Sequence, residues 1–378
     1  MRMSARDPQE SGRAASILEL FFDLVFAIAV SAAAGQLHDA MSSGEVAHGL
    51  GAYAMVFFAI WWAWMNFTWF GTSFSTDDWL YRVITIVQMG GVLVLAAGIE
   101  PAFADGDWTI IVIAYVVMRI AMIVQWLRAA QAPGPLRHVA LTYATGIGFV
   151  QLLWIGFLFL PEAASVPVFI VLMLAEIAVP MVAERRQRTP LHPEHIADRY
   201  GCFTLILLGE SLLSSADGII DALHGGEALG GLISIAILAL VSTAAVWWIY
   251  FWPPHERAIT SFSRSLQYGY THYVVFAAAG AFSAGVGVEI DRLLGSSEMS
   301  EVAASFTVTV PIAIFLLGIW FVAIRCNADR VVNAAVLIGA ALVLLDPILP
   351  IPVALTAVVL AAIVAVLVAR QPVPAAEG

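Results

Sequence analysis

Long uninterrupted apolar runs constrain this chain more than any other feature of its sequence. From Ile17 onward, stretches of about 20 apolar residues recur with only short polar breaks between them. A helix rises about 1.5 Å per residue, so each run is long enough to cross a hydrocarbon core of about 30 Å. Hydrophobic residues make up 61% of the 378 residues and charged residues only 12%, against about 45–50% and about 25% in soluble domains. The sequence therefore predicts an all-α, polytopic helical membrane protein and excludes a water-soluble globule.

The positions of these runs predict about twelve membrane-spanning helices. We expect the spans at residues 17–37, 49–70, 80–99, 108–128, 138–160, 165–183, 197–219, 229–252, 268–290, 303–325, 331–346 and 350–369. Because only the turn at 346–350 separates the last two, ten spans with a re-entrant pair are an alternative. No clear small-residue cleavage site follows the first run, so we interpret it as a retained helix rather than a signal peptide.

The predicted spans fall into two sets of six. We expect a cytoplasmic N-terminal segment at 1–16, a first six-helix half at 17–184, a cytoplasmic loop at 185–196, a second six-helix half at 197–370 and a cytoplasmic tail at 371–378. The offset that aligns Asp23 with Glu210 also brings Trp61-Trp62 near Trp247-Trp248. Halves of six spans share one orientation, so this similarity indicates a 6+6 parallel repeat, with chance similarity of apolar helices as the alternative.

Arginine positions test this topology, because loops that stay in the cytoplasm carry the positive charge. All 17 basic residues are arginine: fifteen fall on one predicted side, Arg292 falls opposite, and Arg119 lies within the fourth span. The pattern predicts that both termini are cytoplasmic. The scattered arginines and the net charge of -11 argue against nucleic-acid binding.

The sequence offers little for soluble catalysis or metal chemistry. No loop is long enough to fold as a domain, so we expect the activity to lie in the membrane and do not expect an enzyme. Cys202 and Cys326 lie in or beside apolar runs, which indicates neither a disulfide framework nor a thiolate metal site. His192 and His195 lack the third and fourth ligands of a zinc site. We expect no cofactor, no metal and no catalytic residues.

Ionisable residues inside the spans are the candidate functional groups. Each costs about 2.5–3.5 kcal/mol at the centre of a membrane helix, so it has to be paired or used. Depth counting places Arg119, Glu176 and Glu210 near mid-membrane. The candidates in the cytoplasmic half are Glu19, Asp23, Arg82, Arg199 and His272.

Glu19 and Asp23 are four residues apart and share a helical face, where unpaired like charges repel each other. They need a cationic partner or a shared proton. Arg82, Arg119 and Arg199 are the candidate partners, and any of them would make the pair part of a salt-bridge network.

The other candidates each allow two interpretations. Glu210 shares a helical face with Arg199, eleven residues earlier, and is either a proton-binding or substrate-binding carboxylate or the permanent partner of Arg119. Glu176 stands alone on an apolar helix. His272 is either a proton relay or an interfacial hydrogen-bonding histidine. Two tryptophan runs, 61–69 and 247–252, either line a ligand pocket or, as their place near the interface favours, form an aromatic belt.

Several of these residues stand in motifs that resemble one family, the low temperature requirement protein A (LtrA) family. The motifs are Glu19-Leu20-Phe21-Phe22-Asp23-Leu24-Val25-Phe26, Asp77-Asp78 with Arg82, Met89-Gly90-Gly91-Val92-Leu93-Val94-Leu95-Ala96, His195-Ile196-Ala197-Asp198-Arg199-Tyr200-Gly201 with Leu208-Gly209-Glu210-Ser211, and Tyr268-x-Tyr270-x-His272. Asp198 stands where the family pattern has Glu, which shortens the reach of that carboxylate. The resemblance implies a multi-pass protein of the bacterial inner membrane, from a group named for a requirement during growth in the cold, and it implies no reaction.

We expect a secondary transporter, with proton coupling as an option, that acts on a small solute or proton within the lipid bilayer. Asp23, Arg119 and Glu210 would surround its central site, with Arg199 and His272 in support. An ion channel is one alternative, because Phe22-Asp23-x-x-Phe26 resembles the first-helix motif of lysosomal-type potassium channels. A structural or sensory membrane protein, with its charges in a rigid network, is the other.

Overall fold

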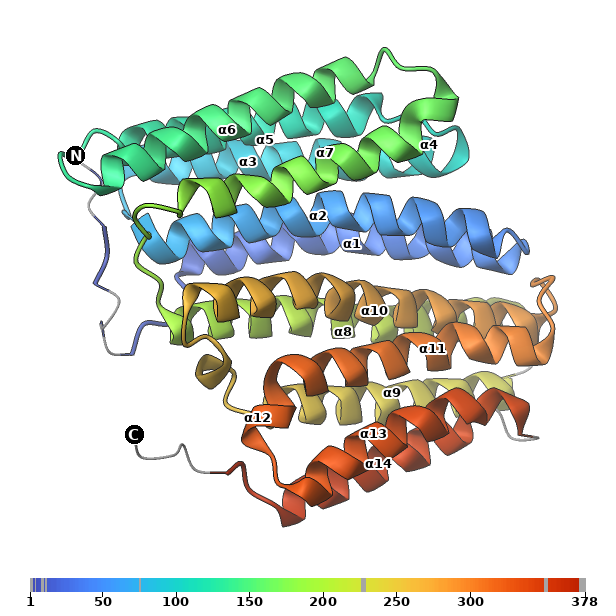
Figure 1. Cartoon of the computed structure of the whole chain (residues 1–378). Helices are drawn as coiled ribbons and strands as arrows, with labels where there is room; N and C mark the ends of the chain where they lie inside the picture. Colours follow the sequence, from blue (N-terminus) through green and yellow to red (C-terminus); the bar gives the residue numbers. More distant parts are fainter. Residues whose placement is uncertain are drawn as a thin grey trace. The chain divides into compact units, whose positions relative to one another are not determined.

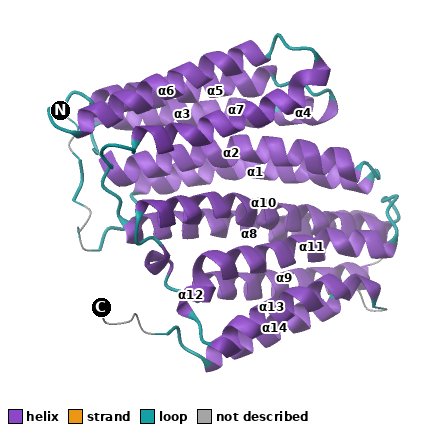
Figure 2. Ribbon diagram, in the orientation of Figure 1, coloured by secondary structure: helices purple, strands orange, loops and turns teal. Residues whose placement is uncertain are grey.

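Helices make up all of the regular structure in the described part of the chain (Figure 2). The computed structural model describes residues 3, 5–7, 10, 12–74, 76–225, 229–349 and 353–373, with the side chains of 218, 219, 221–225 and 229 left out. The α-helices are α1 (Ile17–Ser42), α2 (Val46–Phe74), α3 (Trp79–Ala97), α4 (Ile99–Ala104), α5 (Thr109–Ala129), α6 (Leu136–Phe157), α7 (Glu162–Ala183), α8 (Pro193–Gly225), α9 (Leu229–Phe251), α10 (Phe262–Leu294), α11 (Glu301–Ile319), α12 (Arg325–Asn327), α13 (Arg330–Leu345) and α14 (Ala354–Ala369). Two 3-10 helices, η1 (His255–Ala258) and η3 (Asp346–Ile348), and a π-helix, η2 (Trp320–Ile324), complete the set. The all-α prediction is confirmed.

Ten helical segments in the described residues are long and apolar enough to cross a membrane. They contain α1, α2, α3, α5, α6, α7, α9, α10, α11 and α13. Every predicted span coincides with a helix, but the helices for spans 197–219 and 350–369 are not among the ten. The first, α8, carries ionisable residues along its length, and the second, α14, has only 16 residues. The polytopic architecture is confirmed, whereas twelve spans and the 6+6 repeat stay predictions.

Side chains at the helix starts explain several of the helix boundaries. Asp78, Ser300 and Asp329 precede α3, α11 and α13, and each accepts a hydrogen bond from a backbone N–H of the first turn. Such caps satisfy donors that have no partner within the helix. At the other end, α10 stops where Gly295 adopts φ 75°, a left-handed conformation that glycine tolerates best.

The chain divides into two compact units. The first comprises Met1–Ala32 and Met55–Arg199, and the second Ala33–Ala54 and Tyr200–Gly378. The division after Arg199 lies close to the predicted start of the second half at 197. The sequence did not indicate that 33–54, the end of α1 and the start of α2, belong to the second unit. Of the predicted tail at 371–378, residues 374–378 lie outside the described residues.

In the first unit, successive helices pack side by side: α3 on α5, α5 on α6, and α6 on α7 (Figure 1). Aromatic side chains fill the contacts, and the rings of Trp126 and Tyr143 stack with centroids 4.0 Å apart. Trp61, Trp62 and Trp64 on α2 are at most 1% exposed. The predicted aromatic belt is therefore wrong for this run, because these rings belong to the core.

In the second unit, α10 packs along most of α11, α13 lies against α11, and α14 lies against α9 and α13. The contact between α10 and α11 is close, since a Cβ on Gly285 would overlap the backbone carbonyl of Thr307. Trp247 and Trp248 remain 42% and 43% exposed, as a belt requires. Large apolar side chains such as Leu240 are exposed along these helices, which suits a surface that faces lipid.

Candidate functional site

A buried ion-pair network gathers at one end of the first unit, where α1 and α8 begin. Arg199 of α8 binds both oxygens of Asp23: Nη2 lies 2.6 Å from Oδ1, and Nε lies 3.1 Å from Oδ2. Arg199 Nη1 lies 3.3 Å from Glu19 Oε1. All three side chains are at most 2% exposed. The bidentate geometry suits guanidinium and carboxylate, and it identifies Arg199 as the cation that the sequence left open between three arginines.

His195, one turn before Arg199, completes the network. Its Nε2 donates to Glu19 Oε2 at 3.3 Å, and the hydroxyl of Thr72 donates to Nδ1 at 2.9 Å. An ionised carboxylate only accepts, so the contact with Glu19 requires a proton on Nε2, and in the neutral ring Nδ1 accepts from Thr72. The backbone N–H of Ser16 also donates to Glu19 Oε2, at 2.8 Å. The histidine weighed as a metal ligand in the sequence is therefore a hydrogen-bonding partner of Glu19.

Trp64 on α2 contributes a donor that the sequence did not predict. Its Nε1 lies 2.6 Å from Asp23 Oδ1, and the Arg199 guanidinium lies 5.9 Å from its ring. The indole thus stabilises the carboxylate with its N–H and the cation with its face. Below, "the Arg199 cluster" means Glu19, Asp23, Trp64, His195 and Arg199.

Three polar atoms at this cluster have incomplete hydrogen bonding. In the part of the chain that the structure describes, Tyr81 Oη is buried without a hydrogen-bond partner, and Glu19 Oε1 and Arg199 Nη1 face each other at 3.3 Å as an ion pair without a hydrogen bond. Two of these atoms lie near Gly71: a Cβ there would stand 2.8 Å from Glu19 Oε1 and 3.6 Å from Tyr81 Oη. Buried polar groups in proteins are nearly always hydrogen-bonded, so hydrogen-bonding capacity left unused here marks a place for water, an ion or a ligand group.

The segment before α1 closes over this end of the unit. Arg13 donates to the carbonyl oxygens of Gly71 and Thr72, at 2.7 and 2.6 Å, and these belong to the last turns of α2. The backbone N–H of Ala15 donates to Asp198 at 2.7 Å. Asp198, the residue that departs from the family pattern, therefore binds backbone, and a shorter side chain suffices for that contact.

A second buried pair lies deeper in the same unit. Arg119 of α5 and Glu176 of α7 are 3.3 Å apart and each 2% exposed. Trp62 donates its indole N–H to Glu176 at 2.9 Å. The sequence showed Glu176 alone on its apolar helix, and the structure supplies its ion-pair partner, Arg119, from another helix. The sequence did not give this partner because α5 and α7 are separated in the chain and meet only in the fold.

The remaining predicted candidates lie elsewhere. Arg82 pairs with Asp77 at 2.7 Å, and its side chain is 57% exposed, so it is no part of the Arg199 cluster. Glu210 is half-buried on the part of α8 that belongs to the second unit. His272 is fully buried in α10. Arg199 and Glu210, predicted to share one polar seam, thus fall on either side of the division between the units.

Two histidines and two tyrosines form a closed hydrogen-bond ring in the second unit. The Tyr268 hydroxyl donates to His255 Nδ1 (2.9 Å), and His255 Nε2 donates to the Tyr250 carbonyl (2.7 Å). The Tyr250 hydroxyl donates to His272 Nε2 (3.2 Å), and His272 Nδ1 donates to the Tyr268 carbonyl (2.7 Å). Both ring nitrogens of each histidine are occupied, which favours the hydrogen-bonding interpretation of His272 over the relay. The ring ties η1 to α9 and α10.

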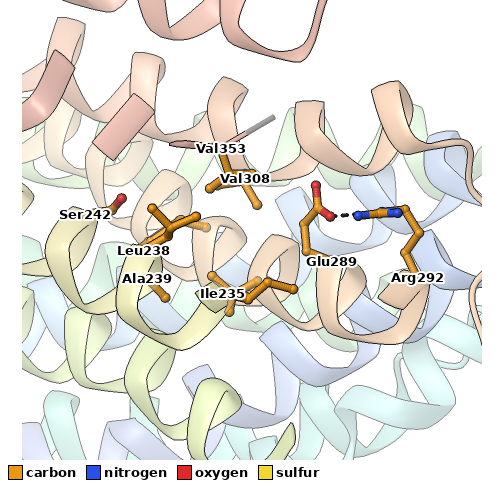
Figure 3. A pocket seen from close by; sticks show the side chains of 10 residues that line it. Ile235, Leu238, Ala239, Ser242, Glu289, Arg292, Val308 and Val353 are labelled. Atoms are coloured by element: carbon orange, nitrogen blue, oxygen red, sulfur yellow. Dashed lines mark hydrogen bonds and ion pairs between the residues drawn. The ribbon is translucent and has the colours of Figure 1, made fainter. Parts of the chain in front are cut away.

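A small cavity of about 70 Å³ in the second unit lies beside Glu289, a buried carboxylate that was not among the predicted candidates. Glu289 accepts from Ser305 at 2.8 Å and from Arg292 at 3.0 Å. Figure 3 shows this pair at one end of the cavity and Ser242 at the other. Ser242 Oγ is buried and, within the described residues, has no hydrogen-bond partner. The space is large enough for ordered water. Glu289 could have been found from sequence, since it is an ionisable residue inside the predicted span 268–290.

Buried ion pairs on apolar spanning helices define a multi-pass helical membrane protein whose candidate functional groups lie within its helix bundles. Comparison with known sequences gives the family. The chain belongs to the bacterial low temperature requirement A protein (LtrA) family, whose sequence profile matches residues 14–369. The match confirms the motif resemblance and extends it through the region after residue 300.

A curated relative is similar over a shorter stretch. The chain is 29% identical over 255 residues to an uncharacterized protein of Rhizobium meliloti (strain 1021), an alignment that covers 65% of this chain and 60% of that protein. The chain thus spans about 60% of the length of the relative that it matches. This likeness carries no activity with it.

Proposed function

We propose that this LtrA family member is a proton-coupled secondary transporter of the bacterial inner membrane, with both termini in the cytoplasm and no enzymatic chemistry. The observation that carries the proposal is hydrogen-bonding capacity left unused at the Arg199 cluster: Glu19 Oε1 and Arg199 Nη1 pair at 3.3 Å without a hydrogen bond, and the buried Tyr81 Oη beside Gly71 has no hydrogen-bond partner. A purely structural network gains by satisfying every group, because an unsatisfied buried group costs about 1–3 kcal/mol. A binding site keeps groups in reserve for its ligand.

The Arg199 cluster supports proton coupling because its charges admit more than one proton arrangement. With Glu19 ionised, His195 donates to it and Thr72 donates to His195. A proton that reaches His195 Nδ1 makes the Thr72 hydroxyl an acceptor, and a proton that reaches Glu19 Oε1 makes that oxygen a donor. Protonation of Glu19 weakens its attraction to Arg199 Nη1, which frees the guanidinium for a polar or anionic group of a solute.

Other ionisable residues of the helices would carry the proton to or from the Arg199 cluster. Arg119 and Glu176 form a second exchange point further along the helices of the first unit. Glu210 and Glu289 are carboxylates of the second unit through which a proton could enter or leave. Intramembrane ionisable residues mark ion and substrate pathways by default.

Proton flux in liposomes tests the proposal. Purified protein is reconstituted with a pH-sensitive dye inside, and pH gradients and membrane potentials are imposed. We expect Glu19→Gln to lower the flux about tenfold, equivalent to about 1.4 kcal/mol in the rate-limiting barrier. Glu162→Gln, at an exposed position at the start of α7, is the matched control. Absence of flux in the wild type, or equal flux in a folded Glu19→Gln protein, contradicts the proposal.

Gly71→Ala separates site geometry from charge. The added methyl group would lie 2.8 Å from Glu19 Oε1, so it fills the space beside Glu19 Oε1 and Tyr81 Oη without removing any charge. We expect it to reduce flux as Glu19→Gln does. Gly90→Ala on α3 meets nothing within 4 Å and should leave flux unchanged. Stepwise single-channel currents in the wild type would favour the ion channel instead, because a carrier gives none.

The closed His255–His272 ring favours the structural alternative for the second unit, since all its ring nitrogens are satisfied. On that view the protein stabilises or senses the membrane without turnover. Unchanged flux together with lower thermal stability, in both the Glu19→Gln and the Gly71→Ala proteins, would support it.

A further inference from the structure

The second unit contains an open apolar groove with no assigned role. Its volume is about 550 Å³, within the range of about 300–1,000 Å³ usual for ligand sites. The end of α1 and the start of α2 form one wall, and α10 and α11 form the other. Along α11 the lining runs from Ala303 to Ile314, a length of about 17 Å at 1.5 Å per residue.

The hydroxyl groups in the groove are already used by the protein. Tyr53 donates to the carbonyl oxygen of Ala277 at 2.9 Å, and Tyr273 donates to that of Ala54 at 2.7 Å. Thr307 donates to the carbonyl oxygen of Ala304 at 2.6 Å. A ligand inside the groove therefore meets methyl, methylene and aromatic surface, so this part of the ligand has to be apolar.

Small side chains make the groove deep, and its exposed apolar edges open toward the lipid. Ala281 of α10 and Ala303 of α11 are among the lining residues, where longer side chains would fill the space. Leu50, Val274 and Ile314 line the groove and remain 48%, 45% and 39% exposed. On a protein that crosses a bilayer, an apolar groove with exposed apolar edges is accessible to acyl chains.

One end of the groove is acidic. Glu45 precedes the lining residue Val46, and Glu298 precedes Met299; both are exposed. The Glu298 carboxylate also lies close to the α1–α2 turn, since Oε2 is 3.7 Å from where a Cβ on Gly44 would stand. Negative charge at the mouth selects for a headgroup that carries an amine and against one that is only anionic.

We propose that this groove binds one acyl chain of a membrane phospholipid with an amine headgroup, such as phosphatidylethanolamine, and that Glu45 and Glu298 contact the amine. The acidic mouth next to an apolar groove is the charge complementarity that distinguishes this lipid from others in the bilayer. The site is separate from the groups proposed for transport, because no residue of the Arg199 cluster, and neither Glu210 nor Glu289, lines the groove.

Native mass spectrometry with added lipid tests this assignment. Wild-type protein is mixed with phosphatidylethanolamine or with phosphatidylglycerol of identical acyl chains, and bound lipid is counted. We expect phosphatidylethanolamine to be retained about fivefold more, and Glu45→Gln with Glu298→Gln to abolish the preference. Equal retention of the two lipids by the wild type would overturn the headgroup assignment.

Filling the groove tests the acyl-chain site itself. Ala281→Phe with Ala303→Phe should abolish cross-linking of a phosphatidylethanolamine that carries a photoreactive group in its acyl chain to peptides of α10 and α11. Ala334→Phe, at an exposed position of α13 outside the groove, is the control and should keep the wild-type pattern. Unchanged cross-linking in the filled variant, in a protein whose thermal unfolding matches the control, overturns the proposal. The proposal is also overturned if the wild-type protein is a dimer and the filled variant is a monomer, because a second copy of the chain then occupies the groove.

Discussion

Individual side chains in this protein owe their charge state to the atoms that surround them. His255 in η1 shows this outside the spanning helices. Its Nε2–H is held by the Tyr250 carbonyl and its Nδ1 by the Tyr268 hydroxyl, and the side chain is buried. A second proton would place a positive charge on a ring that burial keeps away from solvent. Burial accordingly lowers the pKa of His255 to about 4.

This shift predicts how stability depends on pH. An unfolded histidine has a pKa near 6.5, so between about pH 6.5 and pH 4 the unfolded chain binds a proton that the folded protein does not. The free energy of unfolding therefore keeps its full value above about pH 6.5 and falls by up to about 3 kcal/mol as the pH drops through this window. We expect His255→Gln to flatten the fall in thermal stability between pH 7 and 4.5, and His48→Gln, at an exposed position, to leave it unchanged. Equal slopes in the His255→Gln and wild-type proteins would refute the assignment.

At the level of elements, α2 links two other helices of the first unit through hydrogen bonds from its tryptophans. Trp62 and Trp64 are two residues apart, about 200° around the helix, so they project to different sides. Trp64 reaches Asp23 of α1, and Trp62 reaches Glu176 of α7. One helix thus supplies an indole N–H to two buried carboxylates that pair with arginine. Burial of these carboxylates in an apolar bundle is tolerated because each has both an opposite charge and a hydrogen bond.

Removing one indole donor tests this role of α2. Trp64→Phe keeps the aromatic ring but removes the N–H that Asp23 accepts, and a hydrogen bond to a charged group contributes about 1.5–3 kcal/mol. We expect a loss of that order in thermal or denaturant unfolding. Trp79→Phe, at a position that is 74% exposed, should change stability little. A Trp64→Phe protein as stable as the Trp79→Phe protein would show that the indole contact carries no net stabilisation.

At the scale of the whole molecule, the number of membrane crossings depends on α8 and α14. Ten described segments meet the length and apolarity that a span needs, and α8 and α14 lie outside that set. The arginine pattern predicts that both cross, which makes the turn around Leu349 an outer loop and the turn around Ala132 a cytoplasmic one.

Labelling of single cysteines decides the topology. In a protein with Cys202 and Cys326 replaced by serine, we expect Leu349→Cys to react with an impermeant maleimide added outside the cell, as Ser43→Cys should. Ala132→Cys should react only after the membrane is opened. Protection of Leu349→Cys on both sides would favour a re-entrant pair of α13 and α14 and a smaller number of spans.

The sequence by itself determined the fold class, the family and most of the ionisable residues that lie inside the apolar runs. Apolar runs fix helices in lipid because the backbone has to satisfy its own hydrogen bonds there, a local rule that a single sequence obeys visibly. The helix periodicity also placed Glu19 and Asp23 on one face.

Only the tertiary structure decided which charges pair. It assigned Asp23 to Arg199 and Glu176 to Arg119, and it moved Arg82 to an exposed pair with Asp77. It also turned Trp62 and Trp64 from expected interfacial residues into buried donors. The Asp23–Arg199, Glu176–Arg119 and Trp62–Glu176 contacts join helices that are distant in the chain, whereas hydropathy and helix periodicity describe each helix alone. The partner of a buried charge is set by which helices pack together, and that information appears only when the bundles assemble.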